Sequence, residues 1–376
     1  MQQRISGRLR LLASVTILAL ALLMALPMTA LASSKMEEPE HHARSFYQQT
    51  NLVSDLPNTA TITDPNLINP WGLVSSPTSP WWISDNNAGV STLYQGTGQI
   101  VPLVVTIPLP AGSPAGTLAA PTGTVFNGTN GFVVSSQGHS GPSLFIFATE
   151  DGTISGWNPT VDRTHAILTV DRSTVGLGAV YKGLTIGSNA SGTFIYATNF
   201  RFGRVEMFDS NFHLTRSFTD PFLPRGYAPF GIQNIGGKLY VTFALQNAAK
   251  HDDIGGDDHG FVDVFNTDGR LLRRLVSREH LDSPWGLALA PANFGAFSND
   301  LLVGNFRDGH INVFSPRSGE FLGQLESSPR MPIVIDHLWA LEFGNGAAAG
   351  STNSLFFTAG IDNEAHGLFG DIQSKS

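Results

Sequence analysis

Residues 69–76 read NPWGLVSS, and five later segments begin in the same way. They are APTGTVFN at Ala120, VYKGLTIG at Val180, APFGIQNI at Ala228, SPWGLALA at Ser283 and HLWALEFG at His337. Each copy has a small residue at its fourth position, and these are Gly72, Gly123, Gly183, Gly231, Gly286 and Ala340, at intervals of 51, 60, 48, 55 and 54 residues. Self-similarity with a period near fifty is typical of a radial repeat protein.

A second apolar run follows each opening, as in WWISDNN at Trp81, GFVVSSQ at Gly131, FIYATNF at Phe194, LYVTFALQN at Leu239, LLVGNF at Leu301 and LFFTAGIDN at Leu355. Two further strands around a polar turn come next, most clearly in GFVDVFNTDGRLLRRLV at Gly260. Forty glycines, 22 prolines and little helical periodicity also favour an all-β chain. Two stacked sandwiches are the alternative, but they leave the six matching openings unexplained.

We therefore predict an all-β fold, a six-bladed β-propeller with four-stranded antiparallel blades over residues 46–373. The expected blades are at about 70–108, 119–171, 179–220, 227–277, 282–326 and 336–373, followed by a tail at 374–376. The sixth repeat ends too early for a fourth strand, whereas residues 47–56, YQQTNLVSDL, precede the first opening and have strand character. We expect this N-terminal strand to close the ring as the outer strand of the last blade, because closure removes an unpaired edge.

Residues 1–32 combine Arg4, Arg8 and Arg10 with the apolar run LLASVTILALALLMAL and an Ala-x-Ala ending at 30–32, which predicts a cleaved signal peptide. An uncleaved N-terminal anchor is the alternative. We expect residues 33–45 to be a disordered lead and the mature chain to be exported, to the periplasm or the extracellular space. Cleavage leaves 19 basic and 30 acidic residues, a formal charge of −11, which argues against a nucleic-acid partner.

The chain has no cysteine, which excludes disulfides, thiol catalysis and lipid attachment at cysteine. No later segment is apolar enough to span a bilayer, so no membrane span is expected after cleavage.

The openings PWGL and PFGI, the pair NFRFGRVEMF and NFRDGHINVF, and the GFVDVFNTDGRLLRRL hairpin resemble a family of exported bacterial propellers. Its members are mainly conserved hypothetical proteins related to NHL-repeat propellers. The resemblance covers nearly all of the mature chain and implies the fold and export, but no activity. Many members carry a C-terminal Pro-Glu-Pro sorting segment, which is not present in this sequence, so retention at the cell surface by that route is not expected.

In an antiparallel blade, the loops between strands 2 and 3 lie on the same face as the connections to the next blade. The loops predicted from the repeats are DNNAG at Asp85, SSQGHSGPS at Ser135, NFRFG at Asn199, ALQNAAKHDDIGGDDHG at Ala244, NFRDGH at Asn305 and GIDNEAHG at Gly360. Four histidines on this face are candidate ligands for one divalent metal ion, and they are His139, His251, His259 and His366. Imidazole and carboxylate together suit a transition metal, although the spacing matches no dedicated motif.

Further residues of this face are candidates for ligand contact: Asp85, Asn86, Asn199, Arg201, Arg225, Tyr227, Asn305 and Arg307. Asp258 and Glu364 are candidate general acids or bases. The alternatives stay open, because a Gly-rich acidic loop is often a solvated excursion and the matching NFR loops follow from the repeat. For Trp71, Trp285 and Trp339 we favour packing between blades over a sugar-stacking platform. No nucleophile elbow, P-loop or dinucleotide fingerprint occurs.

Two functions from different classes follow. The first is an exported binding module, a monomer that presents its loop-rich His/Asp face to an unknown ligand, a glycan or an extracellular protein. The alternative is a metal-dependent hydrolase or lyase with a divalent ion in the central pocket. A purely structural envelope role is a third option that no segment specifically supports.

Overall fold

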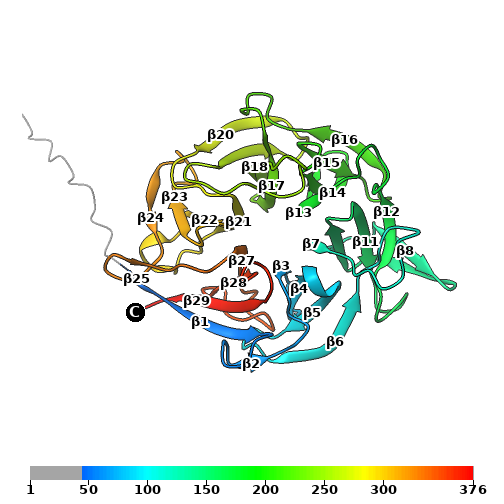
Figure 1. Ribbon diagram of the computed structural model, residues 1–376, viewed down its shortest axis with the longest axis horizontal. Helices are drawn as coiled ribbons and strands as arrows, with labels where there is room; N and C mark the ends of the chain where they lie inside the picture. Colours follow the sequence, from blue (N-terminus) through cyan, green and yellow to red (C-terminus); the bar gives the residue numbers. More distant parts are fainter. Residues whose placement is uncertain (1–44, 376) are drawn as a thin grey trace, which may run out of the picture. The chain divides into compact units, whose positions relative to one another are not determined.

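The structure, a computed structural model, describes residues 45–375, which form six blades of four antiparallel strands each around a central axis (Figure 1). Blade 1 contains β3 (Pro70–Val74), β4 (Trp81–Asp85), β5 (Val90–Tyr94) and β6 (Ile100–Thr106). Blade 2 contains β7 (Pro121–Phe126), β10 (Phe145–Thr149), β11 (Thr153–Trp157) and β12 (Ile167–Asp171). Blade 3 contains β13 (Tyr181–Asn189), β14 (Gly192–Asn199), β15 (Arg204–Phe208) and β16 (Leu214–Phe218). Blade 4 contains β17 (Tyr227–Ile235), β18 (Lys238–Leu245), β19 (Phe261–Asn266) and β20 (Leu271–Ser277). Blade 5 contains β21 (Pro284–Leu289), β22 (Leu301–Asn305), β23 (Ile311–Phe314) and β24 (Phe321–Gln324). The predicted six-bladed propeller is confirmed.

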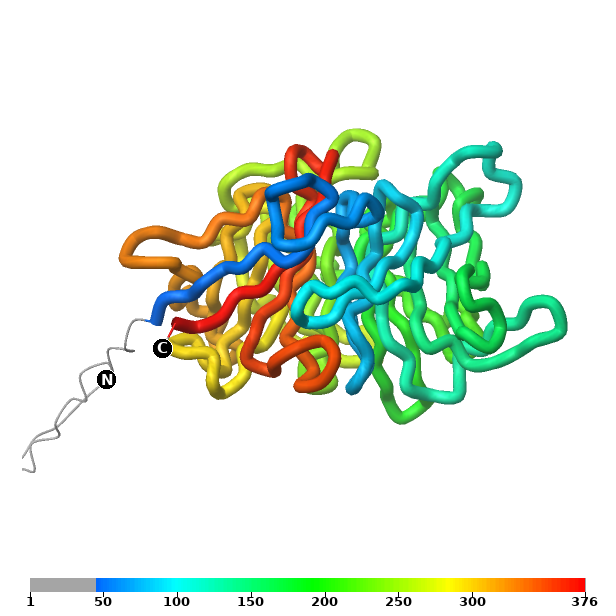
Figure 2. Tube along the Cα trace, turned by 90° about the horizontal axis from the view of Figure 1, so that it is seen from below, coloured from blue at the N-terminus to red at the C-terminus, as the bar shows by residue number. Residues whose placement is uncertain are grey.

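The sixth blade is completed by the N-terminal strand. It consists of β27 (Leu338–Phe343), β28 (Leu355–Ala359), β29 (Leu368–Ser374) and β1 (Tyr47–Ser54). β1 pairs antiparallel with β29 from Tyr47 opposite Ser374 to Ser54 opposite Leu368, and Figure 2 shows the two strands side by side near the C-terminus. The fully buried Tyr47 donates a hydrogen bond from its hydroxyl to Phe294 O at 2.9 Å. The expected ring closure is thus confirmed, and the short strand β2 (Ile62–Thr63) pairs with β1 at the outer edge.

The described residues lie within 45–375, so the expected signal peptide at 1–32 and nearly all of the lead at 33–45 fall outside them. Within the described range, no helix has the length and apolarity needed to cross a membrane.

Blade 2 departs from the sequence-based interpretation. The expected second strand at Gly131 belongs instead to a separate hairpin of β8 (Val133–Ser136) and β9 (His139–Pro142), inserted between the first and second strands of the blade. The true second strand is β10, whose five residues are all buried, whereas two of the four residues of β8 are exposed. Both segments are short apolar runs, and burial in the blade rather than apolar content distinguishes them. The predicted loop at Ser135 therefore lies on the face opposite the loops between strands 2 and 3.

The innermost strands pack against one another at the repeated small residue. A Cβ added to Gly72 would lie 2.4 Å from Thr122 O of the next blade, and one on Gly231 would lie 2.2 Å from Trp285 O. The same close approach occurs at Gly123, Gly183 and Gly286. Real Cβ atoms do not tolerate such distances, so the glycine is required by the spacing of the blades.

Threonines of the second strands connect neighbouring inner strands at this level. Thr358 Oγ1 donates to Trp71 O at 2.7 Å and accepts from Ala340 N, which joins the sixth blade to the first. Thr198 Oγ1 donates likewise to Phe230 O at 2.7 Å. These buried hydroxyls satisfy backbone groups that the tight packing removes from water.

The residue before the small position points toward the axis, where aromatic rings from different blades meet. Trp71 and Trp339 stack with their ring centroids 3.5 Å apart, and Phe306 stacks on Trp339 at 4.0 Å. Trp285 contacts both tryptophans edge-on. We call Trp71, Phe200, Phe230, Trp285, Phe306 and Trp339 the aromatic plug. Because each of its members is less than a tenth exposed, these rings fill the centre and offer no free face for stacking a sugar.

A methyl group at Gly231 tests this packing. Gly231→Ala places a Cβ against Trp285 O, and we expect the free energy of unfolding to fall by about 1–3 kcal/mol. Ala340→Gly is the matched control at the one repeat position that already holds a methyl group, with an expected loss of about 0.5–1 kcal/mol. Urea unfolding of both variants measures the difference. Equal losses in the two variants would show that the inner strands do not require the small residue.

Candidate functional site

A pocket of about 290 Å³ lies above the aromatic plug, on the face of the loops between strands 2 and 3. All six blades contribute to its lining, through Asn69, Trp71, Asn86, Asn87, Glu150, Lys182, Asp252, Asp253, Phe306, Arg307, Trp339, Asn363, Glu364 and Ala365. The walls are mostly amides and ionisable groups, and the floor is aromatic. A concave site on the propeller axis with convergent polar groups is the default place for a small ligand.

Lys182 is the charged group at the base of this pocket. It is the second residue of β13 and occupies the place before Gly183 where four other repeats carry tryptophan or phenylalanine and one carries Thr122. Its side chain is only 3% exposed, and its ammonium group lies 4.9 Å from the centroid of Trp71, which comes from a non-adjacent blade. Lys182 thus places a positive charge where the repeat otherwise places apolar surface.

Carboxylates from two other blades surround this ammonium. Lys182 Nζ donates to Glu150 Oε1, and Asp252 Oδ1 lies 3.8 Å from Nζ. Glu150 follows β10, and its second oxygen accepts a hydrogen bond from Asn86 Nδ2 at 3.0 Å. The buried charge is therefore paired, as desolvation requires.

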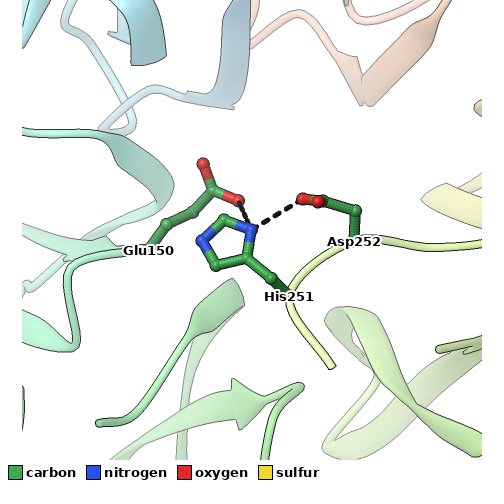
Figure 3. Close-up of side chains that lie close together, drawn as sticks. All are labelled: Glu150, His251 and Asp252. Carbon is green, nitrogen blue, oxygen red and sulfur yellow. Dashed lines mark hydrogen bonds and ion pairs between the residues drawn. The ribbon is translucent and has the colours of Figure 1, made fainter. Parts of the chain in front are cut away.

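His251 completes a trio with Glu150 and Asp252 (Figure 3). His251 Nδ1 donates to Asp252 Oδ1 at 2.7 Å and lies 3.9 Å from Glu150 Oε1. The hydrogen bond from His251, supported by the charge of Lys182, lowers the pKa of Asp252 to about 2. One ligand atom from each of the three residues lies within 4.8 Å of the others, and among residues 45–375 no other such group of histidine and carboxylate side chains occurs.

Asn69 and Glu364 form the opposite wall. Asn69 Nδ2 donates to Glu364 Oε1 at 3.1 Å, and Asn69 Oδ1 accepts from the indole Nε1 of Trp339 at 3.0 Å. Burial raises the pKa of Glu364, and the hydrogen bond from Asn69 only partly opposes this effect. Burial therefore favours the protonated form of Glu364 more than that of an exposed glutamate.

The acidic segment at 250–260 belongs to a long loop of blade 4, and one ion pair holds this loop to blade 5. Arg307 donates to both carboxylate oxygens of Asp253, at 2.7 and 2.9 Å. Asp253 is buried, and a fork-shaped pairing of this kind is stronger and more directional than a surface ion pair. The first half of the loop is thus fixed over the pocket, while Asp257 and Asp258 are exposed.

The four predicted metal ligands do not come together. His251 contacts Glu150 and Asp252 at the edge of the pocket without lining it. His259 hydrogen-bonds to Ile254 O of its own loop, and His366 pairs with Asp55 at 2.7 Å. His139 lies in the β8–β9 hairpin on the other face. Neither His259 nor His366 lines the pocket.

Some of the residues predicted to contact a ligand line the pocket, and others do not. Asn86, Arg307 and Glu364 line the pocket, whereas Asp258 does not. The remaining residues make contacts outside the pocket. Asp85 accepts a hydrogen bond from Thr92, Asn199 accepts one from Phe202 N, and Asn305 donates one to His280 O. Arg201 donates a hydrogen bond to Leu177 O, Tyr227 packs on Phe261, and Arg225 is exposed. Asp85, Asn199 and Asn305 are fully buried and hold the ends of their second strands.

The sequence interpretation missed Lys182, Glu150 and Asn69. Lys182 had a detectable signal, because it is the one charged residue among the six positions that precede the small residue. Glu150 had no such signal in the sequence, because the second strand of blade 2, which it follows, was predicted too early in the chain.

No family model matches the chain. The uncharacterized protein R648 of Acanthamoeba polyphaga mimivirus is 32% identical over 331 residues, which covers 85% of this chain and 78% of that protein. The uncharacterized protein L690 of the same virus is 32% identical over 334 residues, which covers 85% of this chain and 84% of that protein.

Solved structures share the fold at low identity. The virginiamycin B lyase from Staphylococcus aureus superposes with a TM-score of 0.50 and 13% identity, covering 88% of this chain and 99% of that one. A protein assigned as a gluconolactonase superposes with a TM-score of 0.51 and 14% identity, covering 89% of this chain and 93% of that one. The resemblance to a propeller family is confirmed, although the relatives found are viral, whereas the sequence pattern suggested a bacterial family. The chain belongs to the family that includes the mimivirus proteins R648 and L690, and its fold is that of a six-bladed β-propeller.

Proposed function

We propose that the protein binds a small polar ligand in the central pocket above the aromatic plug. The observation that carries this proposal is Lys182, a buried ammonium on the axis at a position where the repeat otherwise favours apolar packing. Apolar side chains of similar volume commonly stabilise a core as well as a buried ion pair does, so stability alone does not account for the charge. A role in contacting a ligand does.

The lining indicates the chemistry of that ligand. Lys182 and Arg307 are opposed by Glu150, Asp252, Asp253 and Glu364, so the pocket carries more negative than positive groups. The amides of Asn69, Asn87 and Asn363 add both donors and acceptors. Neutral polyhydroxylated compounds, including a single sugar unit of a glycan, match this set, while small anions are repelled. The volume also limits the occupant to a small molecule or to one terminal unit of a larger one.

The same proposal places the mature protein outside the cytoplasm. Its support is the arginine-flanked apolar N-terminus with an Ala-x-Ala ending. An exported binding module would meet such ligands in the periplasm or outside the cell.

A thermal-shift screen of neutral sugars and polyols tests ligand binding. We expect at least one compound to raise the Tm of the wild type, because a ligand that binds only the folded state stabilises it. The shift should be lost in Lys182→Met and kept in Lys238→Met, which removes an exposed lysine at the start of β18. A shift that survives in Lys182→Met would place the ligand elsewhere, and no shift across the panel would contradict the proposal.

A metal-dependent hydrolase or lyase is the second candidate function. The trio of Glu150, His251 and Asp252 favours it, because imidazole and carboxylate ligands together suit a divalent transition metal. Proteins named as a lyase and a gluconolactonase share the fold, but at 13% and 14% identity this likeness assigns no reaction to this chain. Against it, Lys182 already supplies the cation that neutralises Glu150, so a metal ion would have to displace the ammonium.

Elemental analysis of protein purified without chelator separates the two functions. The metal-dependent candidate predicts about one equivalent of a divalent transition metal in the wild type. His251→Ala should lose the metal, and His259→Ala, which removes a histidine of the same loop outside the trio, should keep it. Binding of a ligand without metal predicts no stoichiometric metal in any of the three proteins. Metal retained in His251→Ala would refute the trio as its site.

A further inference from the structure

We propose that Lys182 captures a small carbonyl compound in the central pocket as an imine. This inference rests on ligand binding at that pocket and deepens it, because it names a chemical class of ligand and the atom that holds it. The class is a neutral aldehyde or ketone that carries hydroxyl groups.

The position of the amine supports this chemistry. Lys182 Nζ stands at the base of a pocket of about 290 Å³, with a face of Trp71 at 4.9 Å and a face of Phe200 at 5.8 Å. Apolar walls on two sides restrict water around the nitrogen, which favours a nucleophilic lysine. The carboxylate of Glu150 opposes this effect by pairing with the ammonium, and it is also the group that can accept the ammonium proton. The other described lysines, Lys238, Lys250 and Lys375, are exposed.

Glu150 is placed to transfer the protons that the reaction needs. Its Oε1 accepts directly from Lys182 Nζ and lies 3.9 Å from His251 Nδ1. Glu150 takes a proton from the ammonium, and the freed lone pair forms a bond to the carbonyl carbon while the π electrons move to oxygen. That oxygen receives the proton from Glu150 and becomes the hydroxyl of a carbinolamine.

Loss of water completes the capture. A second proton passes from nitrogen through Glu150 to the hydroxyl group, the carbon–oxygen bond breaks, and a carbon–nitrogen double bond forms. The ammonium and the carbonyl compound thus give one protonated imine and one water, without an oxidant or reductant. Nitrogen is positively charged before and after the reaction, so Glu150 and Asp252 stabilise the product as they stabilise the free lysine.

Reductive trapping tests the proposal. Wild-type protein is incubated with dihydroxyacetone and sodium cyanoborohydride, and the rate of adduct formation at each lysine is measured by peptide mass spectrometry. We expect Lys182 to react about tenfold faster than Lys238 and Lys250 despite its burial, because the pocket holds probe and amine together. Glu150→Gln, which keeps the shape but cannot accept a proton, should slow labelling at Lys182 and leave the exposed lysines unchanged.

Lys182→Arg, with Lys238→Arg as its matched control, should lose the fast site while keeping a positive charge on the axis. The comparison among lysines of the wild type is decisive even if a variant does not fold. Labelling of Lys182 no faster than that of the exposed lysines would overturn the proposal. If sugars or polyols still shift the Tm through Lys182 in that case, only the imine is refuted and ligand binding stands. If neither effect is seen, both proposals fail.

Discussion

The close approach of the innermost strands is the constraint on which the rest of the structure depends. Five of the six inner strands touch the next at a glycine that has no room for a Cβ, and the sixth has Ala340 at this place, so the blades stand at a fixed spacing around the axis. The residue before this contact must then point to the centre. Four repeats place an aromatic ring there and so build the aromatic plug, and blade 3 places Lys182 there. The spacing that makes a stable ring thereby also brings a charged side chain to a position that all six blades can reach.

The plug divides the axis into two unequal parts with different chemistry. On the loop-rich side, six blades supply a polar pocket whose ion pairs join neighbouring blades. On the other side, the inner strands enclose a cavity of only about 40 Å³, where Gln233 donates to Glu342 at 2.6 Å and burial raises the pKa of that carboxyl group to about 7. The larger pocket has both the volume and the variety of donors and acceptors that a ligand requires. The smaller cavity has room for only a few water molecules.

The repeat predicted the fold well because one packing requirement recurs in the sequence. The six openings gave the blade number, and the short last repeat gave the closure by the N-terminal strand. The prediction failed in blade 2, where an inserted hairpin has the same apolar character as a blade strand and only burial separates them. The site was harder to predict, because Glu150, Lys182 and Asp252 come from three loops or strand ends whose meeting depends on the angles around the ring. His251 was predicted as a metal ligand from its acidic loop, but its partner Glu150, from blade 2, was not foreseen. His259, only eight residues later, hydrogen-bonds within its own loop instead.

The central claim is that the pocket above the plug is a ligand site and not a structural ion-pair cluster. A high-resolution crystal structure of the mature chain, soaked with a mixture of small neutral polyhydroxylated compounds, tests it most directly. A ligand site predicts ordered non-protein density within hydrogen-bond distance of Lys182 and Glu150, with the direct contact between these two side chains lengthened or lost. Only water in the pocket, with the Lys182–Glu150 pair unchanged in soaked and unsoaked crystals, would contradict the claim.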